Sequence, residues 1–368
     1  MPKPASAARL RAARLDAHGL RTGLPSITAA VRRLGAVQAQ DFAAARWVLG
    51  ARVPGSASAD VDAAIESREV VRSWPMRGTL HLLPTETLRP ILAITGPRIM
   101  QRAATRHRQL ELDREVYSRA RELAETALAG GASLSREELL AAWEAAGIRT
   151  TGQRGYHLIW WLAQDAVLCC GPVEGRGQRF VLLDEWAPAA GRVPDRDETL
   201  ANLAVAYAAG HGPVTVRDFA WWSGLTLTDA RTAFAAAGGA LVAFDEERVV
   251  AADAGWAADP ASTTPRTSRR FVLAAFDEYF LGYTERSDVC DPLHAPRIVP
   301  GLNGVFQPIL VNGAGVVEGL WKVTRAKGEA SVALEGFERS IDPVGYEPAL
   351  ARWARFHGER LGAITTAT

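Results

Sequence analysis

Apolar residues recur at helical spacing near the start of the chain and predict a run of short helices. Ser26 and Asp41 stand where they can cap the second and third of these helices. The expected helices span residues 6–22 (basic and amphipathic), 27–34, 42–51 and 60–67. An alternating stretch follows at residues 70–83. Its Met76-Arg77-Gly78 break predicts a β-hairpin.

Residues 85–125 are expected to be helical, with breaks at Pro90 and Pro97. Arginines recur there at every fourth position, with a histidine and a further arginine adjacent, so one helix face is predicted to be basic. The residues of this face are Arg98, Arg102, Arg106, His107 and Arg108. A solvated face and a phosphate-binding face explain the spacing equally well.

The order of helices followed by a hairpin then returns twice. The expected helices span residues 133–147, 155–166, 199–210, 215–224 and 228–238, and the hairpins 167–183 and 240–251. Helices followed by a two-stranded wing are typical of the winged helix. We therefore expect an α+β fold with three tandem winged-helix modules.

The last part of the chain becomes β-rich after a polar segment at residues 255–268, which is predicted to be a linker. Strands are expected around residues 271–274, 304–311, 315–321 and 331–334, with a turn at Asn312-Gly313. A closing helix is expected from Tyr346 to Leu361. The predicted domains are residues 1–125, 126–190, 191–258 and 269–368.

Composition is that of an ordinary globular protein, with 48% hydrophobic and 23% charged residues among 368. No apolar run reaches 18 residues, and the N-terminus lacks the apolar core of a secretory signal. The three cysteines, two of them adjacent, form neither a disulfide framework nor a metal-binding pattern. We expect a cytoplasmic protein without metal or cofactor, whose eleven tryptophans lie mainly in the core.

Net charge is only +1, but the charge is divided unevenly along the chain. Residues 1–110 carry 17 Lys/Arg and 7 Asp/Glu, whereas residues 111–368 carry 25 and 34. A basic N-terminal part favours a polyanionic partner over a chance excess of solvated charge.

Two glutamines, Gln38 and Gln40, flank one small apolar residue in the stretch between the second and third expected helices. A neutral amide cannot act as a general base, but it offers a carbonyl dipole and N–H donors in fixed positions. On a regular helix the two side chains would point about 200° apart. They can act together only on an extended or irregular backbone. We therefore predict a helix break at residues 36–41, with Asp41 capping the next helix.

Three motifs occur in the order Leu34-Gly35-Ala36-Val37-Gln38-Ala39-Gln40, Met76-Arg77-Gly78-Thr79-Leu80-His81-Leu82, and Phe276-Asp277-Glu278-Tyr279-Phe280-Leu281-Gly282-Tyr283 followed by Arg286. Together they resemble the winged-helix DNA glycosylases of the AlkZ type, over nearly the whole chain. The resemblance implies that the modules form a C-shaped channel for duplex DNA. It also implies monofunctional excision of N7-alkylated purines, including bulky adducts and interstrand crosslinks, as in self-resistance to a genotoxic natural product.

The two catalytic glutamines of that family fall on Gln38 and Gln40. Without the resemblance, the preferred interpretation would be that both side chains only satisfy backbone groups at the helix break. With it, catalysis is favoured. A bifunctional lyase needs an amine nucleophile, and no lysine occurs between Lys3 and Lys322. A monofunctional enzyme is therefore expected.

Other residues are candidates for DNA contact. Arg77 and His81 lie on the hairpin, where phosphate contact and a place near the lesion compete evenly with packing and capping of the first module. Arg46, Arg98 and Arg102 are candidates on helices. Tyr279, Arg286 and Asn312 are candidates for the opposite wall of the channel.

We therefore expect a monomer that binds double-stranded DNA carrying an alkylated purine, away from membranes. Two rival functions remain. One is a non-catalytic winged-helix DNA-binding protein, although many such regulators are small dimers and the second and third modules are acidic. The other is a protein that sequesters the genotoxin, for which no specific feature of the sequence argues.

Overall fold

The computed structural model describes residues 6–175, 177–189, 191–254, 268–302, 304–326 and 328–367. These residues form an α+β fold, as predicted. The chain divides into two compact units: Met1–Val61 with Leu200–Thr368 forms unit 1, and Asp62–Thr199 forms unit 2. Apart from Ser268, the predicted linker at 255–268 lies outside the described residues.

The N-terminal part of unit 1 contains the short helices predicted by its apolar spacing. They are α1 (Ala7–Ala17), α2 (Ile27–Leu34), α3 (Phe42–Gly50) and α4 (Ser58–Glu66), which continues into unit 2. Helix α1 is shorter than predicted and is not amphipathic, because most of its residues are buried, Arg14 included. Leu10 and Ala13 of α1 pack against Phe244 and Val250 of a later hairpin.

That hairpin follows three helices of unit 1. The elements are α10 (Arg196–His211), α11 (Val216–Ser223), α12 (Leu227–Ala237), a 3-10 turn η3 (Gly238–Ala240), β6 (Leu241–Ala243) and β7 (Val249–Ala251). The predicted cap Thr215 forms a capping box with Asp218. Helix α12 begins one residue earlier than predicted, because Thr226 caps it. An isolated antiparallel β-bridge between Val214 and Val249 pairs a third short segment with β7 of this hairpin.

The C-terminal part of unit 1 is a five-stranded sheet in the order β12-β11-β10-β9-β8. The strands are β8 (Phe271–Leu273), β9 (Ile309–Val311), β10 (Val317–Ala326), β11 (Glu329–Gly336) and β12 (Arg360–Ala367). Neighbours are antiparallel except β11 and β12, which are parallel. Helices α13 (Glu278–Leu281) and α14 (Ala295–Ile298) and the 3-10 turn η4 (Pro300–Leu302) lie between β8 and β9 in the sequence.

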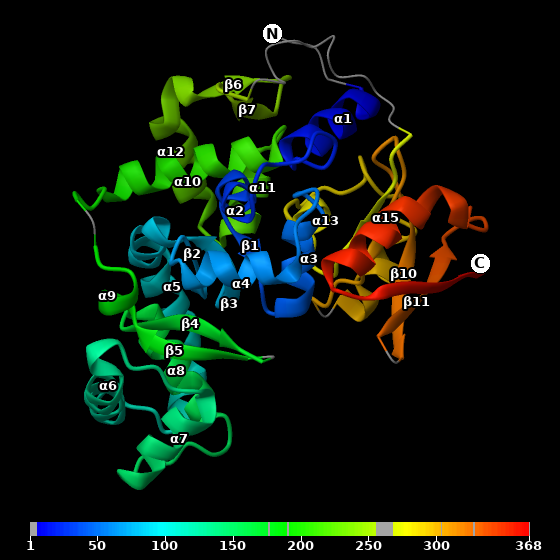
Figure 1. The fold of residues 1–368 in the computed structure, drawn as a ribbon. Coiled ribbons are helices and arrows are strands. Elements are labelled where there is room, and N and C mark those ends of the chain that lie inside the picture. Colours follow the sequence, from blue (N-terminus) through cyan, green and yellow to red (C-terminus); the bar gives the residue numbers. More distant parts are fainter. Residues whose placement is uncertain are drawn as a thin grey trace. The chain divides into compact units, whose positions relative to one another are not determined.

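Helix α15 (Pro343–Phe356) packs against β8 and β12, and Figure 1 shows it alongside the sheet. The predicted closing helix at 346–361 therefore runs too far. The described chain ends in a strand, not in a helix. This strand begins at Arg360, where the β-branched residues Ile364, Thr365 and Thr366 favour an extended backbone.

Unit 2 contains two hairpins that join in one sheet in the order β3-β2-β4-β5. Its elements are β2 (Val70–Met76), β3 (Thr79–Pro84), η1 (Thr85–Thr87), α5 (Leu88–Gln109), α6 (Arg114–Leu128), η2 (Ala129–Gly131), α7 (Arg136–Ala145), α8 (Arg154–Gln164), β4 (Leu168–Glu174), β5 (Gly177–Leu182) and α9 (Leu183–Trp186). Figure 1 shows α6, α7 and α8 gathered beside β4 and β5. The predicted domain boundary at residue 126 falls inside α6.

Helix α5 runs through both prolines, so the predicted breaks at Pro90 and Pro97 are wrong. Pro90 occupies the first turn, where the missing N–H has no intrahelical partner in any case. The break comes instead at residues 110–113, where Asp113 caps α6. His107 is buried and stacks on Trp161 with ring centroids 4.8 Å apart. It is therefore not part of the basic face on which Arg98, Arg102 and Arg106 are exposed.

The described tryptophans lie mainly in the core, as predicted, although the two members of each adjacent pair differ in burial. Trp160 and Trp222 are buried, whereas Trp221 is 45% exposed. No helix within the described ranges combines the length and apolar content needed to cross a bilayer. The described side chains also contain no group of three or more His, Cys, Asp or Glu placed to hold a metal ion.

Candidate active site

The helix break predicted around the glutamine pair is confirmed. Helix α2 ends at Leu34, strand β1 (Val37–Gln38) follows, and α3 begins at Phe42. The Asp41 carboxylate caps α3 by accepting the backbone N–H of Ala44 at 3.0 Å. Neither glutamine lies in a helix, so the two side chains are not forced to point about 200° apart, as they would on a regular helix. Gln38 is 8% exposed and Gln40 is open to solvent.

Close packing of helices fixes the end of α2, just before the glutamines. Gly35 ends the helix at φ +73°, a conformation that L side chains rarely adopt. Gly210 of α10 faces the end of α2 so closely that a Cβ there would lie 2.8 Å from Leu34 Cα and closer still to the Arg33 carbonyl oxygen. The absence of a side chain at residue 210 therefore sets the position from which the glutamine strand starts.

Glu278 lies behind the strand and holds its backbone. Its Oε1 accepts the Gln38 N–H at 3.0 Å. Its Oε2 accepts the indole N–H of Trp222 at 3.1 Å and lies 3.3 Å from Nε2 of His211. The Glu278 and His211 side chains are both fully buried. A backbone group in the glutamine strand is thus bonded to a carboxylate 240 residues further along the chain.

A second buried network adjoins this carboxylate. Asp277 accepts two N–H donors from Arg52, at 3.0 and 2.8 Å, in a fully buried ion pair. Arg52 also donates to Nδ1 of His18 at 3.2 Å, so the His18 proton resides on Nε2, which faces the Tyr283 hydroxyl at 2.9 Å. Burial, with His211 and Arg52 nearby, holds the pKa of His18 well below 6.5, so His18 is neutral at physiological pH.

In unit 2, the turn at Arg77 and Gly78 joins β2 to β3, as predicted. Arg77 donates to Nε2 of His81 at 3.1 Å, and Nδ1 of His81 lies 2.8 Å from the Thr79 carbonyl oxygen. Because a carbonyl only accepts, the His81 ring carries its proton on Nδ1. Arg77 adopts φ +54°, an uncommon conformation for a residue other than glycine. The His81 side chain is fully buried, so its predicted DNA contact is wrong, whereas the role of the half-buried Arg77 stays a prediction.

The helical arginine candidates differ in their surroundings. Arg46 of α3 is half-buried, with its guanidinium 4.3 Å from the centre of the Phe42 ring. Arg98 and Arg102 are exposed on α5, and Arg106 on the same face donates to Gln153 at 2.7 Å. Exposure leaves Arg98 and Arg102 accessible to a phosphate, whereas Arg46 is held against a ring.

The prediction that Tyr279 contacts DNA is wrong. The side chain is fully buried, and its hydroxyl donates to the Gly315 carbonyl oxygen at 2.8 Å. The Arg286 side chain is mostly enclosed by three aromatic rings, those of Trp221, Phe280 and Phe306. Its Nε donates to the backbone carbonyl oxygen of Phe280 at 2.8 Å. Its role in binding DNA stays a prediction.

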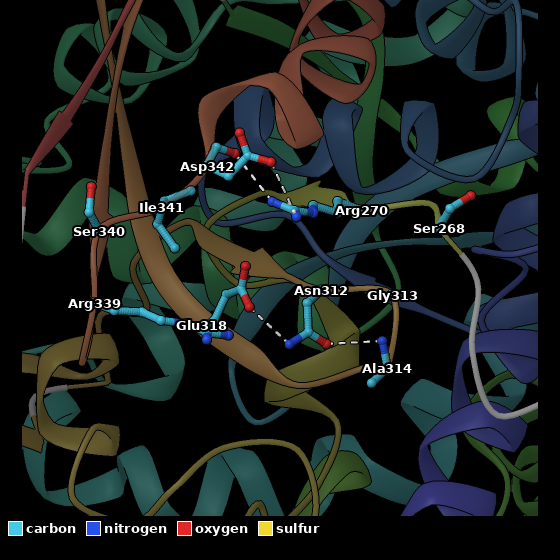
Figure 2. A pocket seen from close by; sticks show the side chains of 10 residues that line it. All are labelled: Ser268, Arg270, Asn312, Gly313, Ala314, Glu318, Arg339, Ser340, Ile341 and Asp342. Carbon is cyan, nitrogen blue, oxygen red and sulfur yellow. Dashed lines mark hydrogen bonds and ion pairs between the residues drawn. The ribbon is translucent and has the colours of Figure 1, made fainter.

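Asn312 uses its amide within its own turn. Its Nδ2 donates to Glu318 at 2.9 Å, and its Oδ1 accepts the N–H groups of Ala314 and Val316 at 3.0 and 3.1 Å. This turn lines a pocket of about 630 Å³. Figure 2 shows the turn together with Arg270 and Asp342, which line the same pocket and form an ion pair. The stated bonds use only one of the two Nδ2–H donors of Asn312, and its role in binding DNA too stays a prediction.

The chain is similar to known DNA glycosylases in sequence and in structure. The model of the DNA glycosylase AlkZ-like family matches residues 31–359. An interstrand DNA cross-link repair glycosylase from Streptomyces sahachiroi is 28% identical over 317 residues, which are 81% of this chain and 82% of the relative. The solved structure of the DNA glycosylase AlkZ from Streptomyces sahachiroi is similar with a TM-score of 0.79 and 25% identity, and the match covers 99% of this chain and all of the other.

Proposed function

Because the family model matches most of its length, the chain belongs to the AlkZ-like DNA glycosylases, and we propose that it hydrolyses the N-glycosidic bond of N7-alkylated purines with Gln38 and Gln40 as the catalytic pair. That it is a DNA glycosylase follows from the family. The lesion, the catalytic residues and the mode of bond cleavage are the proposal.

The chemistry of the lesion matches the chemistry of an amide pair. A purine alkylated at N7 is already cationic, so it leaves as a neutral base without an acid catalyst. The enzyme must stabilise an oxocarbenium-like sugar and place a water molecule. Fixed carbonyl dipoles do both, and one such contact lowers the barrier by about 3 kcal/mol, by analogy with an oxyanion-hole donor.

The geometry of the strand is the observation that carries this proposal. Gln38 has an extended backbone whose N–H is bonded to a buried carboxylate, and Asp41 begins the next helix three residues later. Gln40 follows two residues later, beyond the end of β1 and open to solvent, on the irregular stretch before α3. Because this backbone is not helical, we propose that the amides of Gln38 and Gln40 act on one sugar and one water molecule.

Water is the proposed nucleophile because the chain offers almost no amines. No lysine lies between Lys3 and Lys322, so a Schiff-base route from the glutamine strand has no candidate amine there. The product is an abasic site in an uncut strand.

Duplex DNA is the proposed partner, bound by one copy of the chain in the cytoplasm. Three groups of helices followed by a hairpin support the winged-helix interpretation, in both units. Exposed arginines at residues 98 and 102 of α5 are the proposed phosphate contacts. Bulky adducts and crosslinks are the proposed natural lesions, in keeping with the cross-link repair named for the similar glycosylase from Streptomyces sahachiroi.

The test is single-turnover excision from a duplex with one N7-methylguanine, one N7-linked bulky adduct, or an unmodified guanine. We expect abasic sites in the two alkylated duplexes and none in the control, with strand cleavage only after alkali. Binding without any abasic product would favour a non-catalytic damage-binding protein. Strand cleavage without alkali would contradict the monofunctional mechanism.

A further inference from the structure

A buried carboxylate lies directly behind the glutamine strand, and the proposed chemistry does not use it. Glu278 is fully buried, and its Oε1 accepts the Gln38 backbone N–H at 3.0 Å. A carboxylate is costly to bury unless its oxygens are hydrogen-bonded, and each bond then becomes specific and strong. The fold places this group where it determines the position of one peptide of the glutamine strand.

The carboxylate is itself held in place from the other side. Trp222 of α11 donates to Oε2 at 3.1 Å, and His211 at the end of α10 lies 3.3 Å from the same atom. The second nitrogen of His211 lies 3.2 Å from the Tyr207 carbonyl oxygen, and the Tyr207 ring stacks on the imidazole with centroids 4.6 Å apart. Rotation of the Glu278 side chain would break its contacts with Trp222 and His211.

The backbone around Glu278 is also constrained. Phe276 adopts φ +59°, a costly conformation for a bulky residue. The next residue, Asp277, caps the short helix α13 through the Tyr279 N–H and pairs with Arg52 just after α3. Two consecutive carboxylates thus hold the chain before α3, at Gln38, and after it, at Arg52.

We infer that Glu278 is a positioning residue of the excision reaction. Its carboxylate fixes the Gln38 peptide, and through that peptide the direction of the Gln38 side chain and the start of the irregular stretch that carries Gln40. The inference rests on the proposed function, since it assigns Glu278 a role only through Gln38 and Gln40. Misplacing a catalytic group by about 1 Å can reduce a rate about 100-fold.

The substitutions Glu278→Gln and Glu278→Ala separate this role from a general contribution to folding. The glutamine variant keeps an oxygen for the Gln38 N–H but places an NH₂ donor against the Trp222 indole N–H. The alanine variant removes both acceptors. Asp218→Asn is the matched control, because Asp218 is equally buried in unit 1 and bonds Thr215 and Thr284 instead of the glutamine strand.

Two readouts are needed, one chemical and one at the Gln38 peptide. We expect single-turnover excision of N7-methylguanine to fall about 10-fold in Glu278→Gln and about 100-fold in Glu278→Ala, with the Kd for DNA changed less than twofold. Selective ¹⁵N labelling of the eight glutamines gives few amide signals, and the Gln38 signal is assigned by its loss in Gln38→Asn. The resonance of the Gln38 amide proton should move upfield in both Glu278 variants, and this proton should exchange faster with solvent. Neither change is expected in Asp218→Asn.

Excision within twofold of wild type in both Glu278 variants would overturn the inference while leaving the proposed function intact. An unchanged Gln38 amide signal, or an equal loss of excision in Asp218→Asn, would also overturn it. Failure of the wild-type protein to excise any alkylated base would instead overturn the proposed function, and the inference with it.

Discussion

Replacing Gly210 by alanine should slow excision, although residue 210 carries no chemistry. A Cβ at residue 210 would lie 2.8 Å from Leu34 Cα, whereas non-bonded carbon atoms settle at about 3.5–4.0 Å. The end of α2 must therefore move about 1 Å away from α10. The atoms to be displaced are backbone, which cannot rotate aside as a flexible side chain would. The glutamine strand begins three residues after Leu34 and moves with it.

The expected costs can be worked from this displacement. Overpacking destabilises by about 1–3 kcal/mol, and the better helix propensity of alanine offsets about 1 kcal/mol of that. Stability should therefore fall by no more than about 2 kcal/mol, so the variant folds. The excision rate should fall by up to about 100-fold, since a 1 Å misplacement has that effect.

Single-turnover excision of N7-methylguanine and urea unfolding measure the two effects separately. Gly239→Ala is the matched control, because nothing lies within 4 Å of a Cβ at residue 239. That control should match wild type in both measurements. A Gly210→Ala protein with wild-type excision would refute the argument that α10 fixes the position of the strand.

Three further results are expected. Arg77→Gly should be about 1 kcal/mol more stable than Arg77→Ala in thermal unfolding, because glycine accepts φ +54° without strain, and both should bind DNA more weakly than wild type. Burial, then His157, lowers the pKa of His107 to about 4. As the pH falls below 6.5, the imidazole of residue 107 is protonated in the unfolded state before it is protonated in the folded state. Urea unfolding should therefore show stability lost between pH 6.5 and 4, by at most about 2 kcal/mol at pH 5. The loss should be smaller in His107→Gln. Neutralising Arg98 or Arg102 should reduce the slope of log K against log salt by about 1 each, and an unchanged slope in both variants would exclude them as phosphate contacts.

Local signals in the sequence were sufficient to predict the elements around the glutamines. Ser26 and Asp41 cap α2 and α3 as expected, since capping depends only on a side chain and the next three residues. The Arg77-Gly78 turn follows from the alternation on either side of it. At these positions neighbouring residues decide the conformation, and the predictions are confirmed.

The errors in α5 at Pro97 and in α1 have tertiary causes. Helix α5 continues through Pro97 while its residues Leu92 and Thr95 are buried in unit 2, so packing outweighs the lost hydrogen bond. Helix α1 looks basic and amphipathic in sequence, yet Arg14 is buried with its guanidinium 3.8 Å from the centre of the Tyr283 ring. Neither outcome is visible in a local window.

Glu278 was visible to sequence reasoning only as part of the motif Phe276-Asp277-Glu278-Tyr279. Its partners Gln38, His211 and Trp222 are far from it in the chain, and no periodicity links them. The same motif led to the wrong prediction for Tyr279, because a motif does not tell which of its side chains point inward. The available signal was a carboxylate between aromatic residues, where a buried acceptor needs donors.

The most direct test of the central claim is single-turnover excision of N7-methylguanine by wild type, Gln38→Ala, Gln40→Ala and the double variant. If the two amides act as one unit, each single variant should lose about 100- to 1,000-fold and the double variant little more. DNA binding should stay within a few-fold of wild type. A double variant that releases the base at the wild-type rate would contradict the claim.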